Sequence, residues 1–559
     1  MPPKTVIPNS LQCPVPGCPT CLADTNAAKR HLHESHPNCI HLYDSSICHR
    51  IGIHLCHHPK CQNSLRTKIF TSASSYERHR ASCHPPPPSS PSTSTLSIAL
   101  SSIYSGDQPD RVTTSWSNAF NFISQHYPVQ PPNFRHTWLH FLKHRNAATF
   151  TSIQASLLRA ISLAHASQGP SCNPAPFWWL FLHLELLILH PTSADHRDGE
   201  SIQSTIADRL IAFRDGRIEE LWSSAMAIVS KSTTTSPPTY SQSNKAIQHA
   251  ADSDNWRTAY QRACSSQQKA TISTANENFI HDLYVEPHPS LHEADLPTSP
   301  QPPPPPLYDL PGDICETIKS LPKGKANGII ADSVDTFSRL VRLDNPSINS
   351  DLRFFFNIIF TNKLPNEIKP YLRDTYLFCL HKDPNDPSKL RPIGVPTAIR
   401  RILGNHIARS YRQRFALHLL PHNFAVGVSN GQDFVIKTTQ LAIDKFITGP
   451  QSEGRPPTRA VVFTDMTNMF NLISREELRD CLRSHFPELI QVADLFYQES
   501  GNVHFQHGSG DWFNLQMEEG VNQGCPLSSI FAALVFHRVL APLQASLNER
   551  ANARVMNAM

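Results

Sequence analysis

The sequence predicts a multidomain protein with small ββα units at its N-terminus, a mostly α-helical middle region and an α+β region at its C-terminal end. Three observations support this fold class. Paired cysteines and histidines fill the first 84 residues, two proline runs interrupt the chain, and alternating apolar segments typical of strands follow the second run. At about 150 residues per domain, 559 residues are too many for one core. We expect the paired units in 1–84, a Pro/Ser linker in 85–95, a mostly helical region in 96–285, a proline-rich linker in 286–306 and the α+β region in 307–559.

The N-terminal pairs are Cys13, Cys18, His31 and His36, and then Cys56, Cys61, His79 and His84. Zn²⁺ prefers four nitrogen or sulfur ligands in a tetrahedron, and two histidines about one helical turn apart supply two of them. The N-terminus lacks the apolar segment of a secretory signal, which favours metal binding over disulfides. We therefore predict paired C2H2-like zinc fingers that hold Zn²⁺ and bind nucleic acid, with Leu22 and Ala28 in the small core of the first. A protein-binding finger and a disordered head with chance spacing are the alternatives.

The middle region, from about Leu96 to Leu283, has the aromatic spacing of packed helices. Its longest apolar stretch, Phe177 to Leu189, is too short to span a membrane and contains His183 and Glu185. We interpret this stretch as a buried helix, and we expect the scattered histidines and tryptophans of the region to be core residues. No membrane partner is predicted.

The net charge of +4 is small for the length of the chain, but basic residues gather in one segment. No Asp or Glu occurs from Pro387 to Gln432, where Lys389 and six arginines lie. Arg400 to Arg409 begins an amphipathic helix with arginines expected on one face. Such a face suits sequence-independent contacts with a phosphate backbone.

The C-terminal region combines strands and helices around a single carboxylate. Ala460 to Thr464 is an apolar, β-branched run that predicts a strand buried on both faces, with Asp465 at its end. Ser474 begins a capping box, so the next helix has its own cap. Two alternating runs within 503–517 predict a hairpin that leads into the glycine-rich segment 520–524 and then a helix. The two glycines of that segment suit the close approach of a flat substrate.

Two motifs of this region resemble those of a known family. Asp465-x-x-Asn468-x-Phe470-Asn471 resembles the first catalytic motif of reverse transcriptases, and Gly520-Val521-Asn522-Gln523-Gly524-Cys525-Pro526-Leu527-Ser528 resembles their glutamine-glycine motif. The hairpin from Tyr376 to Ile393 resembles the fingers hairpin, and Leu321 to Gly328 resembles the segment before the fingers. The resemblance is to non-LTR retrotransposons of the N-terminal zinc-finger type. It implies an RNA-directed DNA polymerase, a nucleotidyltransferase of fingers-palm fold, which acts in the nucleus on an RNA template, a DNA target or primer and deoxynucleoside triphosphates.

The resemblance also implies roles for residues of this chain. Asp465 is implied as the catalytic residue and a Mg²⁺ ligand. The implied substrate-binding residues are Phe470, under the sugar; Gln523 and Gly524, at the templating base pair; and Lys382 and Arg391, at the triphosphate. Lys382 and Arg391 would meet a physical need, because a multiply charged phosphate group requires fixed cations. The alternative for Phe470 is that it is a core residue. The alternative for Lys382 and Arg391 is a solvated hairpin with incidental charges.

One part of the family's site is missing from this sequence. Two Mg²⁺ ions roughly 4 Å apart need several hard oxygen ligands, which one carboxylate cannot supply. The family adds an aromatic-x-Asp-Asp motif on a later hairpin, and no such motif occurs between Ala541 and Met559. We therefore expect a truncated reverse-transcriptase region that binds nucleic acid or nucleotide and polymerises negligibly. The alternative is a non-catalytic, zinc-dependent nucleic-acid-binding protein that retains the polymerase remnant as a scaffold.

Overall fold

The computed structural model of the chain contains two compact units, residues 1–91 and 92–559. The structure describes residues 13, 15, 18–20, 25–35, 48, 53–55, 69–70, 109–125, 138–166, 173–191, 199–229, 269–270, 272, 274–284, 308–324, 328–330, 332–383, 386–448, 462, 466, 468–507, 511–550 and 556. Within these residues, the chain is mostly helical and has one five-stranded sheet and one two-stranded hairpin.

The described part of the first unit consists of a helix and the small hairpin. α1 (Thr25–Ser35) turns Ala28 and Leu32 inward, and both side chains are fully buried. β1 (His54–Leu55) pairs antiparallel with β2 (Ile69–Phe70). Ala28 is therefore buried, as expected of a finger core, whereas Leu22 lies outside the described residues. The ββα finger fold itself stays a prediction.

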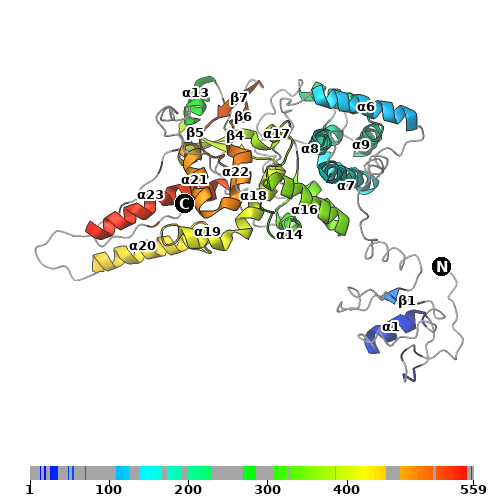
Figure 1. The fold of residues 1–559 in the computed structure, drawn as a ribbon, viewed down its shortest axis with the longest axis horizontal. Helices are drawn as coiled ribbons and strands as arrows, with labels where there is room; N and C mark the ends of the chain where they lie inside the picture. The colour runs from blue at the N-terminus through cyan, green and yellow to red at the C-terminus, as the bar shows by residue number, and fades with distance from the viewer. Residues whose placement is uncertain are drawn as a thin grey trace, which may run out of the picture. The chain divides into compact units, whose positions relative to one another are not determined.

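The second unit begins with a set of helices and continues into the mixed region after residue 308 (Figure 1). The helices up to residue 284 are α6 (Pro109–Gln125), η2 (Trp138–Phe141), α7 (His144–Ala166), α8 (Ala175–Leu189), α9 (Gly199–Arg214), α10 (Ile218–Val229) and α13 (Thr274–Leu283). The later helices are α14 (Ile314–Ser320), α15 (Val334–Arg342), α16 (Pro346–Phe360), α17 (Lys369–Arg373), α18 (Ala398–Ser410), α19 (Arg412–Leu419), α20 (Gly431–Thr448), η3 (Met469–Leu472), α21 (Arg475–His485), η4 (Pro487–Leu489), α22 (Ile490–Tyr497) and α23 (Ser528–Arg550).

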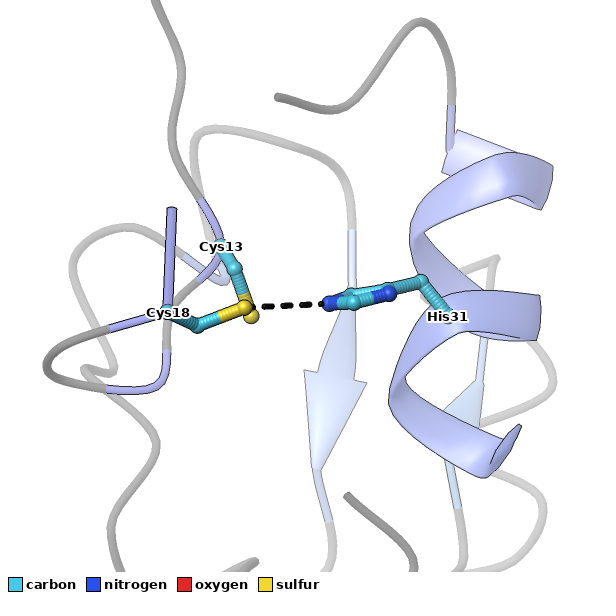
Figure 2. A group of neighbouring side chains, drawn as sticks. All are labelled: Cys13, Cys18 and His31. Carbon is cyan, nitrogen blue, oxygen red and sulfur yellow. Dashed lines mark hydrogen bonds between the residues drawn. The ribbon is translucent and has the colours of Figure 1, made fainter. Parts of the chain in front are cut away.

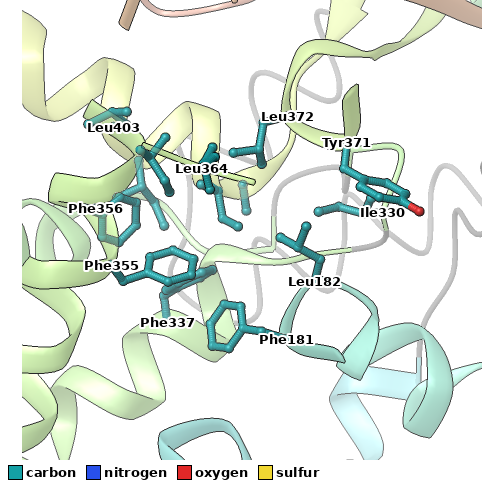
Figure 3. Close-up of a cluster of buried hydrophobic side chains, with 14 of the residues drawn as sticks. Phe181, Leu182, Ile330, Phe337, Phe355, Phe356, Leu364, Tyr371, Leu372 and Leu403 are labelled. Carbon is teal, nitrogen blue, oxygen red and sulfur yellow. The ribbon is translucent and has the colours of Figure 1, made fainter. Parts of the chain in front are cut away.

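α8 lies at the centre of the core because its sequence is apolar on every side. All of its residues except Pro176 are buried, and it packs against α6, α7, α9 and α10. Trp178 of α8 stacks on Phe355 of α16 with ring centroids 4.4 Å apart. Figure 3 shows Phe181 of α8 converging with Phe337 and Phe355 in one apolar cluster. The predicted buried helix is thus confirmed, and the helical middle region shares a core with the segment after residue 308.

The sheet of the second unit is built around β4 (Thr375–Asp383). The strands are ordered β3 (Lys269–Ala270), β4, β6 (Gly501–Gln506) and β7 (Trp512–Met517), and β5 (Asp386–Val395) also pairs with β4. β4 and β5 form an antiparallel hairpin, as do β6 and β7, whereas β4 and β6 are parallel. α13 contributes Ile280 to the apolar cluster of this sheet. The hairpin predicted within 503–517 from alternating apolar residues is confirmed, and so is the hairpin predicted from Tyr376 to Ile393.

The helices that flank the predicted motifs begin where the sequence indicates. The Ser474 hydroxyl accepts a hydrogen bond from the Glu477 N–H at 3.2 Å and caps α21. α23 follows the glycine-rich segment and buries Phe531 and Leu534 completely. From Ser528 to Glu549, α23 is the one helix in the described part of the chain that is long and apolar enough to cross a membrane. Core helices of folded proteins pass the same test, and the first half of α23 is such a helix.

Candidate metal centre and candidate nucleotide site

The first candidate site is a cluster of two cysteines and a histidine in the N-terminal unit. The ligand atoms of Cys13, Cys18 and His31 all lie within 4.8 Å of one another, the only such group of three among the described residues. Figure 2 shows the two sulfurs side by side, facing the imidazole ring, and Cys18 Sγ lies 3.4 Å from His31 Nε2. Two thiols and an imidazole nitrogen are ligands that Zn²⁺ prefers.

Local backbone structure brings these ligands together. The Cys13 N–H donates to the Thr20 carbonyl at 3.0 Å, and the Cys18 N–H donates to the Val15 carbonyl at 3.2 Å. The chain therefore turns back on itself between the cysteines and places both sulfurs on one side. α1 supplies His31 because its apolar face, with Ala28 and Leu32, is buried on the inside of the unit.

A bound cation would change the electrostatics of the cluster. Burial raises the pKa of the Cys13 thiol, and the neighbouring Cys18 sulfur raises that pKa further. A divalent ion would reverse this trend, because it stabilises the thiolates that coordinate it. Three of the four ligands predicted for the first finger thus fit Zn²⁺, which would supply a structural cross-link. The fourth, His36, and the second set, Cys56, Cys61, His79 and His84, lie outside the described residues.

The second candidate site surrounds the loop from Gly520 to Gly524, which joins β7 to α23. The Val521 N–H donates to the Phe470 carbonyl at 2.8 Å, and the Gly394 N–H donates to the Gln523 carbonyl at 2.7 Å. The loop therefore contacts both η3, which carries Phe470, and β5, which carries Arg391. Four of the predicted substrate-binding positions, Phe470, Arg391, Gln523 and Gly524, belong to these three hydrogen-bonded segments.

The glycines of the loop are required by the fold of the chain itself. Gly524 has a φ of +118°, and a Cβ on it would lie 2.0 Å from the Gly394 carbonyl oxygen. Gly520 has a φ of +73°, and its Cβ would lie 2.5 Å from the backbone of Asn471. The nearest neighbours of the missing Cβ atoms are thus the chain's own backbone. Only glycine combines this conformation with such contacts.

Side chains that sequence reasoning missed hold the loop in place. The Asn522 side-chain amide donates to Thr375 Oγ1 at 2.8 Å, and the Ser528 hydroxyl donates to the Asn522 carbonyl at 2.7 Å. Tyr497 Oη lies 3.3 Å from Ser528 Oγ and accepts a hydrogen bond from Arg400 at 2.8 Å. Asn522 and Ser528 lie within a recognised motif. The other partners are distant in sequence, and no local pattern indicates them.

A cavity of about 330 Å³ opens beside the loop. Its wall includes Gly524, Gly394 and Arg401, together with Leu321 and Pro322 from the segment that resembles the one before the fingers. The cavity therefore connects two motifs that are far apart in the sequence. Apolar walls with one arginine could accept a planar group that carries negative charge.

The predicted binding residues differ in their exposure. Arg391 is exposed and lies opposite Leu380 in the β4–β5 ladder, which leaves its guanidinium accessible. Phe470 and Gln523 are half-buried, and Phe470 packs against the large apolar core. Lys382 belongs to β4, but its side chain lies outside the described residues. Phe470 thus combines the contacts of a core residue with a partly exposed face.

One predicted element differs in the structure. Val462, the described residue within the predicted strand from Ala460 to Thr464, belongs to no strand and is 78% exposed. A strand is buried on both faces only when neighbouring strands and covering elements enclose it, and Val462 has neither form of cover. The prediction of a doubly buried strand is wrong at this residue. Asp465, the predicted Mg²⁺ ligand, lies outside the described residues.

The predicted basic face is also only partly present. Arg400 is fully buried, donates to the Arg373 carbonyl at 3.0 Å and lies 4.2 Å from the centroid of the Phe496 ring. Arg414 forms an ion pair with Glu488, and Arg412 donates to the Gly427 carbonyl at 2.9 Å. These guanidinium groups therefore form hydrogen bonds or ion pairs with other groups of the protein. The helical pattern could not show this, because the partners lie on other elements.

No protein-family model matches the chain, and no curated protein matches it.

Proposed function

We propose that residues 307–559 form a reverse-transcriptase-like fingers and palm region that binds a template–primer duplex and a deoxynucleoside triphosphate. The observation that carries this proposal is the loop from Gly520 to Gly524, which hydrogen-bonds to both the Phe470 turn and the strand that bears Arg391. A nucleotide site needs a cation for the phosphates and a planar or aromatic surface for the sugar and base. Arg391 would supply the cation. Phe470 and the cavity beside Gly524 would supply the surface for the sugar and base.

The experiment for this proposal measures binding, because the sequence contains only the first of the family's two Mg²⁺-binding motifs. A fluorescent deoxynucleoside triphosphate is titrated into the full chain in the presence of a template–primer duplex. We expect Arg391→Ala to weaken nucleotide binding by about tenfold or more, since a charge-assisted phosphate contact contributes about 1.5–3 kcal/mol. Arg342→Ala, at an exposed position on α15, is the control and should bind like the wild type. Equal affinity of the wild-type and Arg391→Ala chains would contradict the proposal.

A second function is favoured by the geometry of Cys13, Cys18 and His31. In this alternative the protein is a non-catalytic, zinc-dependent nucleic-acid-binding protein, and the polymerase-like region is a scaffold. A chelator and Cys13→Ser should then abolish DNA binding, because removal of the metal unfolds a small metal-dependent unit. Asp465→Ala and Arg391→Ala should leave DNA binding unchanged. A loss of nucleotide binding in Arg391→Ala with DNA binding intact would separate the two functions.

A further inference from the structure

Four histidines from separate segments gather where α19, α21 and α23 meet. His418 lies on α19, His422 in the turn after it, His485 at the end of α21 and His537 in α23. The ring centroids of His418 and His485 are 4.3 Å apart, those of His418 and His537 are 5.1 Å apart, and those of His422 and His537 are 5.5 Å apart. We call these residues the four-histidine cluster.

Two ring nitrogens of the cluster lack hydrogen-bond partners. The Nδ1 atoms of His422 and His537 are buried, and neither has a partner within the described part of the chain. His422 as a whole is only 9% exposed. A buried polar atom without a partner costs roughly 1–3 kcal/mol, so native structures pair such atoms with protein, water or an ion. A metal ion is one kind of ligand that would satisfy such a nitrogen through its lone pair.

Three of the six ring separations in the cluster are close to that of two imidazoles on one metal ion. Two imidazoles bound at about 2.1 Å to the same tetrahedral ion have ring centres about 5 Å apart. The measured separations lie on either side of that value. The ring nitrogens themselves are not drawn together as tightly as the ligand atoms of Cys13, Cys18 and His31. The χ2 torsion of histidine has a broad energy profile, so the ring can rotate about it. A half-turn exchanges the positions of ring nitrogens and ring carbons, while the ring centre stays almost in place.

Burial and the neighbouring rings act on two histidines of the cluster. Burial, together with the neighbouring His485 and His537, lowers the pKa of His418 to about 4. Burial likewise lowers the pKa of His537, with additional effects of His422 and His485. Both effects disfavour the protonated forms of His418 and His537.

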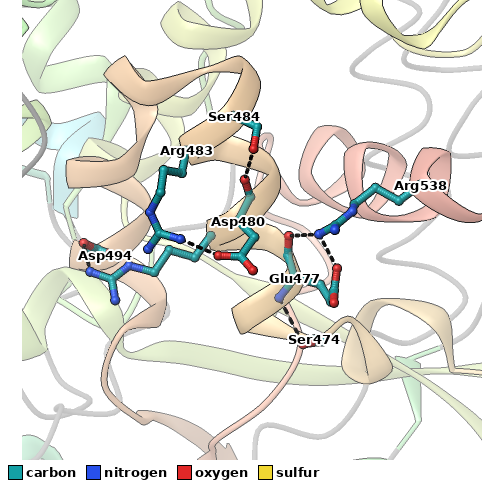
Figure 4. A network of polar contacts seen from close by, with 8 residues as sticks. Ser474, Glu477, Asp480, Arg483, Ser484, Asp494 and Arg538 are labelled. Carbon is teal, nitrogen blue, oxygen red and sulfur yellow. Dashed lines mark hydrogen bonds and ion pairs between the residues drawn. The ribbon is translucent and has the colours of Figure 1, made fainter. Parts of the chain in front are cut away.

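The adjacent cations are occupied by partners of their own. Arg414 pairs with Glu488, and Arg538, next to His537 in the sequence, pairs with Glu477 of α21. Figure 4 shows Arg538 reaching across from α23 to Glu477. This ion pair also fixes α23 against α21 beside the cluster. His485 is exposed, so an ion can reach the cluster from solvent.

We propose that the four-histidine cluster binds one divalent transition-metal ion of the class that prefers imidazole, with Zn²⁺ as the representative. The ion would take ligands from His418, His485 and His537, with His422 as the fourth, and would cross-link α19, α21 and α23. Its role is structural, since four protein ligands leave no open position for a substrate. The proposal does not depend on the proposed nucleotide site or on the cysteine cluster of the first unit.

The experiment counts metal ions in the full chain. Wild-type and variant chains are dialysed against Zn²⁺, and bound zinc is measured by mass spectrometry. We expect His418→Asn/His537→Asn to lose about one equivalent of zinc, as removal of two of four ligands requires. Cys13→Ser/Cys18→Ser should lose zinc independently, so that the losses add in the combined variant. His281→Asn, at an exposed position on α13, is the matched control and should retain all the zinc of the wild type.

A second measurement does not require the double variant to fold. His537→Cys replaces one nitrogen ligand by a thiolate, and the Co²⁺ difference spectrum against wild type should then gain a thiolate-to-cobalt charge-transfer band. His485→Asn removes one proposed ligand at an exposed position and should weaken zinc binding at the cluster by about tenfold or more. The proposal is overturned if the double variant binds as much zinc as the wild type. It is equally overturned if His537→Cys adds no charge-transfer band.

Discussion

One carboxylate oxygen of Glu185, on α8, accepts hydrogen bonds from both the backbone N–H and the hydroxyl of Ser333, at 2.9 and 3.0 Å. Ser333 is the N-cap of α15, so a residue of the helical middle region completes the start of a helix in the C-terminal region. The other carboxylate oxygen is buried without a partner in the described residues. Burial therefore raises the pKa of Glu185 to about 8.

We predict that Glu185→Gln makes the stability of the protein less sensitive to alkaline pH. Between pH 4.5 and about 8 the folded protein holds a proton on Glu185 that the unfolded chain releases. The contribution of this residue is therefore greatest below pH 4.5 and is lost as the pH rises through about 8. Glutamine is neutral and keeps the accepting oxygen. The free energy of unfolding of Glu185→Gln, measured by urea titrations between pH 5 and 8, should fall less with rising pH than that of the wild type.

The control for this prediction is Glu367→Gln, which neutralises an exposed glutamate. Its pH dependence should follow that of the wild type. A parallel decline of the wild-type and Glu185→Gln curves would show that Glu185 is ionised in the folded protein. Burial also raises the pKa of Asp332 to about 6, in the same direction, so Glu185→Gln removes only part of the slope.

A buried histidine gives the opposite pH dependence on the acid side. Burial, assisted by Arg209, lowers the pKa of His190 to about 3. The unfolded chain therefore binds a proton that the folded protein excludes between pH 6.5 and about 3. The stabilising contribution is complete above pH 6.5 and is lost as the pH falls. His190→Gln can keep contacts with the Leu186 carbonyl and Ser224, so its free energy of unfolding should decline less between pH 6.5 and 4.

The control is His281→Gln, which changes an exposed histidine and should follow the acid denaturation of the wild type. His183, whose pKa burial lowers to about 4, remains in every variant and maintains part of the acid sensitivity. Equal acid slopes for wild type and His190→Gln would contradict the neutral state of His190.

Two arginines of the predicted basic face should respond differently to substitution. Arg400 is fully buried between Phe496 and Tyr497, whereas Arg409 is exposed. Arg400→Ala removes hydrogen bonds and leaves a cavity, so we expect a loss of about 3–5 kcal/mol in the free energy of unfolding. Arg409→Ala should cost less than about 1 kcal/mol. If Arg400 instead contacted nucleic acid, its substitution would weaken binding and leave the thermal midpoint unchanged.

Local patterns predicted much of this fold. The apolar run of α8, the alternating residues of the hairpin within 503–517 and the Ser474 cap each indicate a structure formed within a few neighbouring residues. Contacts between distant segments were not predictable in the same way. The burial of Arg400, the Glu185–Ser333 contact and the four-histidine cluster each join elements far apart in the sequence. For the candidate site, the motifs predicted which segments meet, but no pattern indicated Asn522 and Thr375 as partners.

The glycine at position 524 offers a direct test of how the loop beside the nucleotide site is built. Gly524→Ala places a Cβ 2.0 Å from the Gly394 carbonyl oxygen, at a φ of +118° that other residues rarely adopt. Either the loop or β5 must then move, and the Gly394–Gln523 hydrogen bond should break.

Gly324→Ala is a matched control, because Gly324 also has a positive φ, +65°, but its Cβ would meet nothing within 4 Å. The control should lose only about 1 kcal/mol, the cost of the backbone conformation alone. We expect Gly524→Ala to lower the thermal midpoint further than Gly324→Ala and to weaken deoxynucleoside triphosphate binding, which the control should leave intact. Equal midpoints for the two variants would mean that the loop does not pack against β5, and the contact on which the proposed nucleotide site depends would be absent.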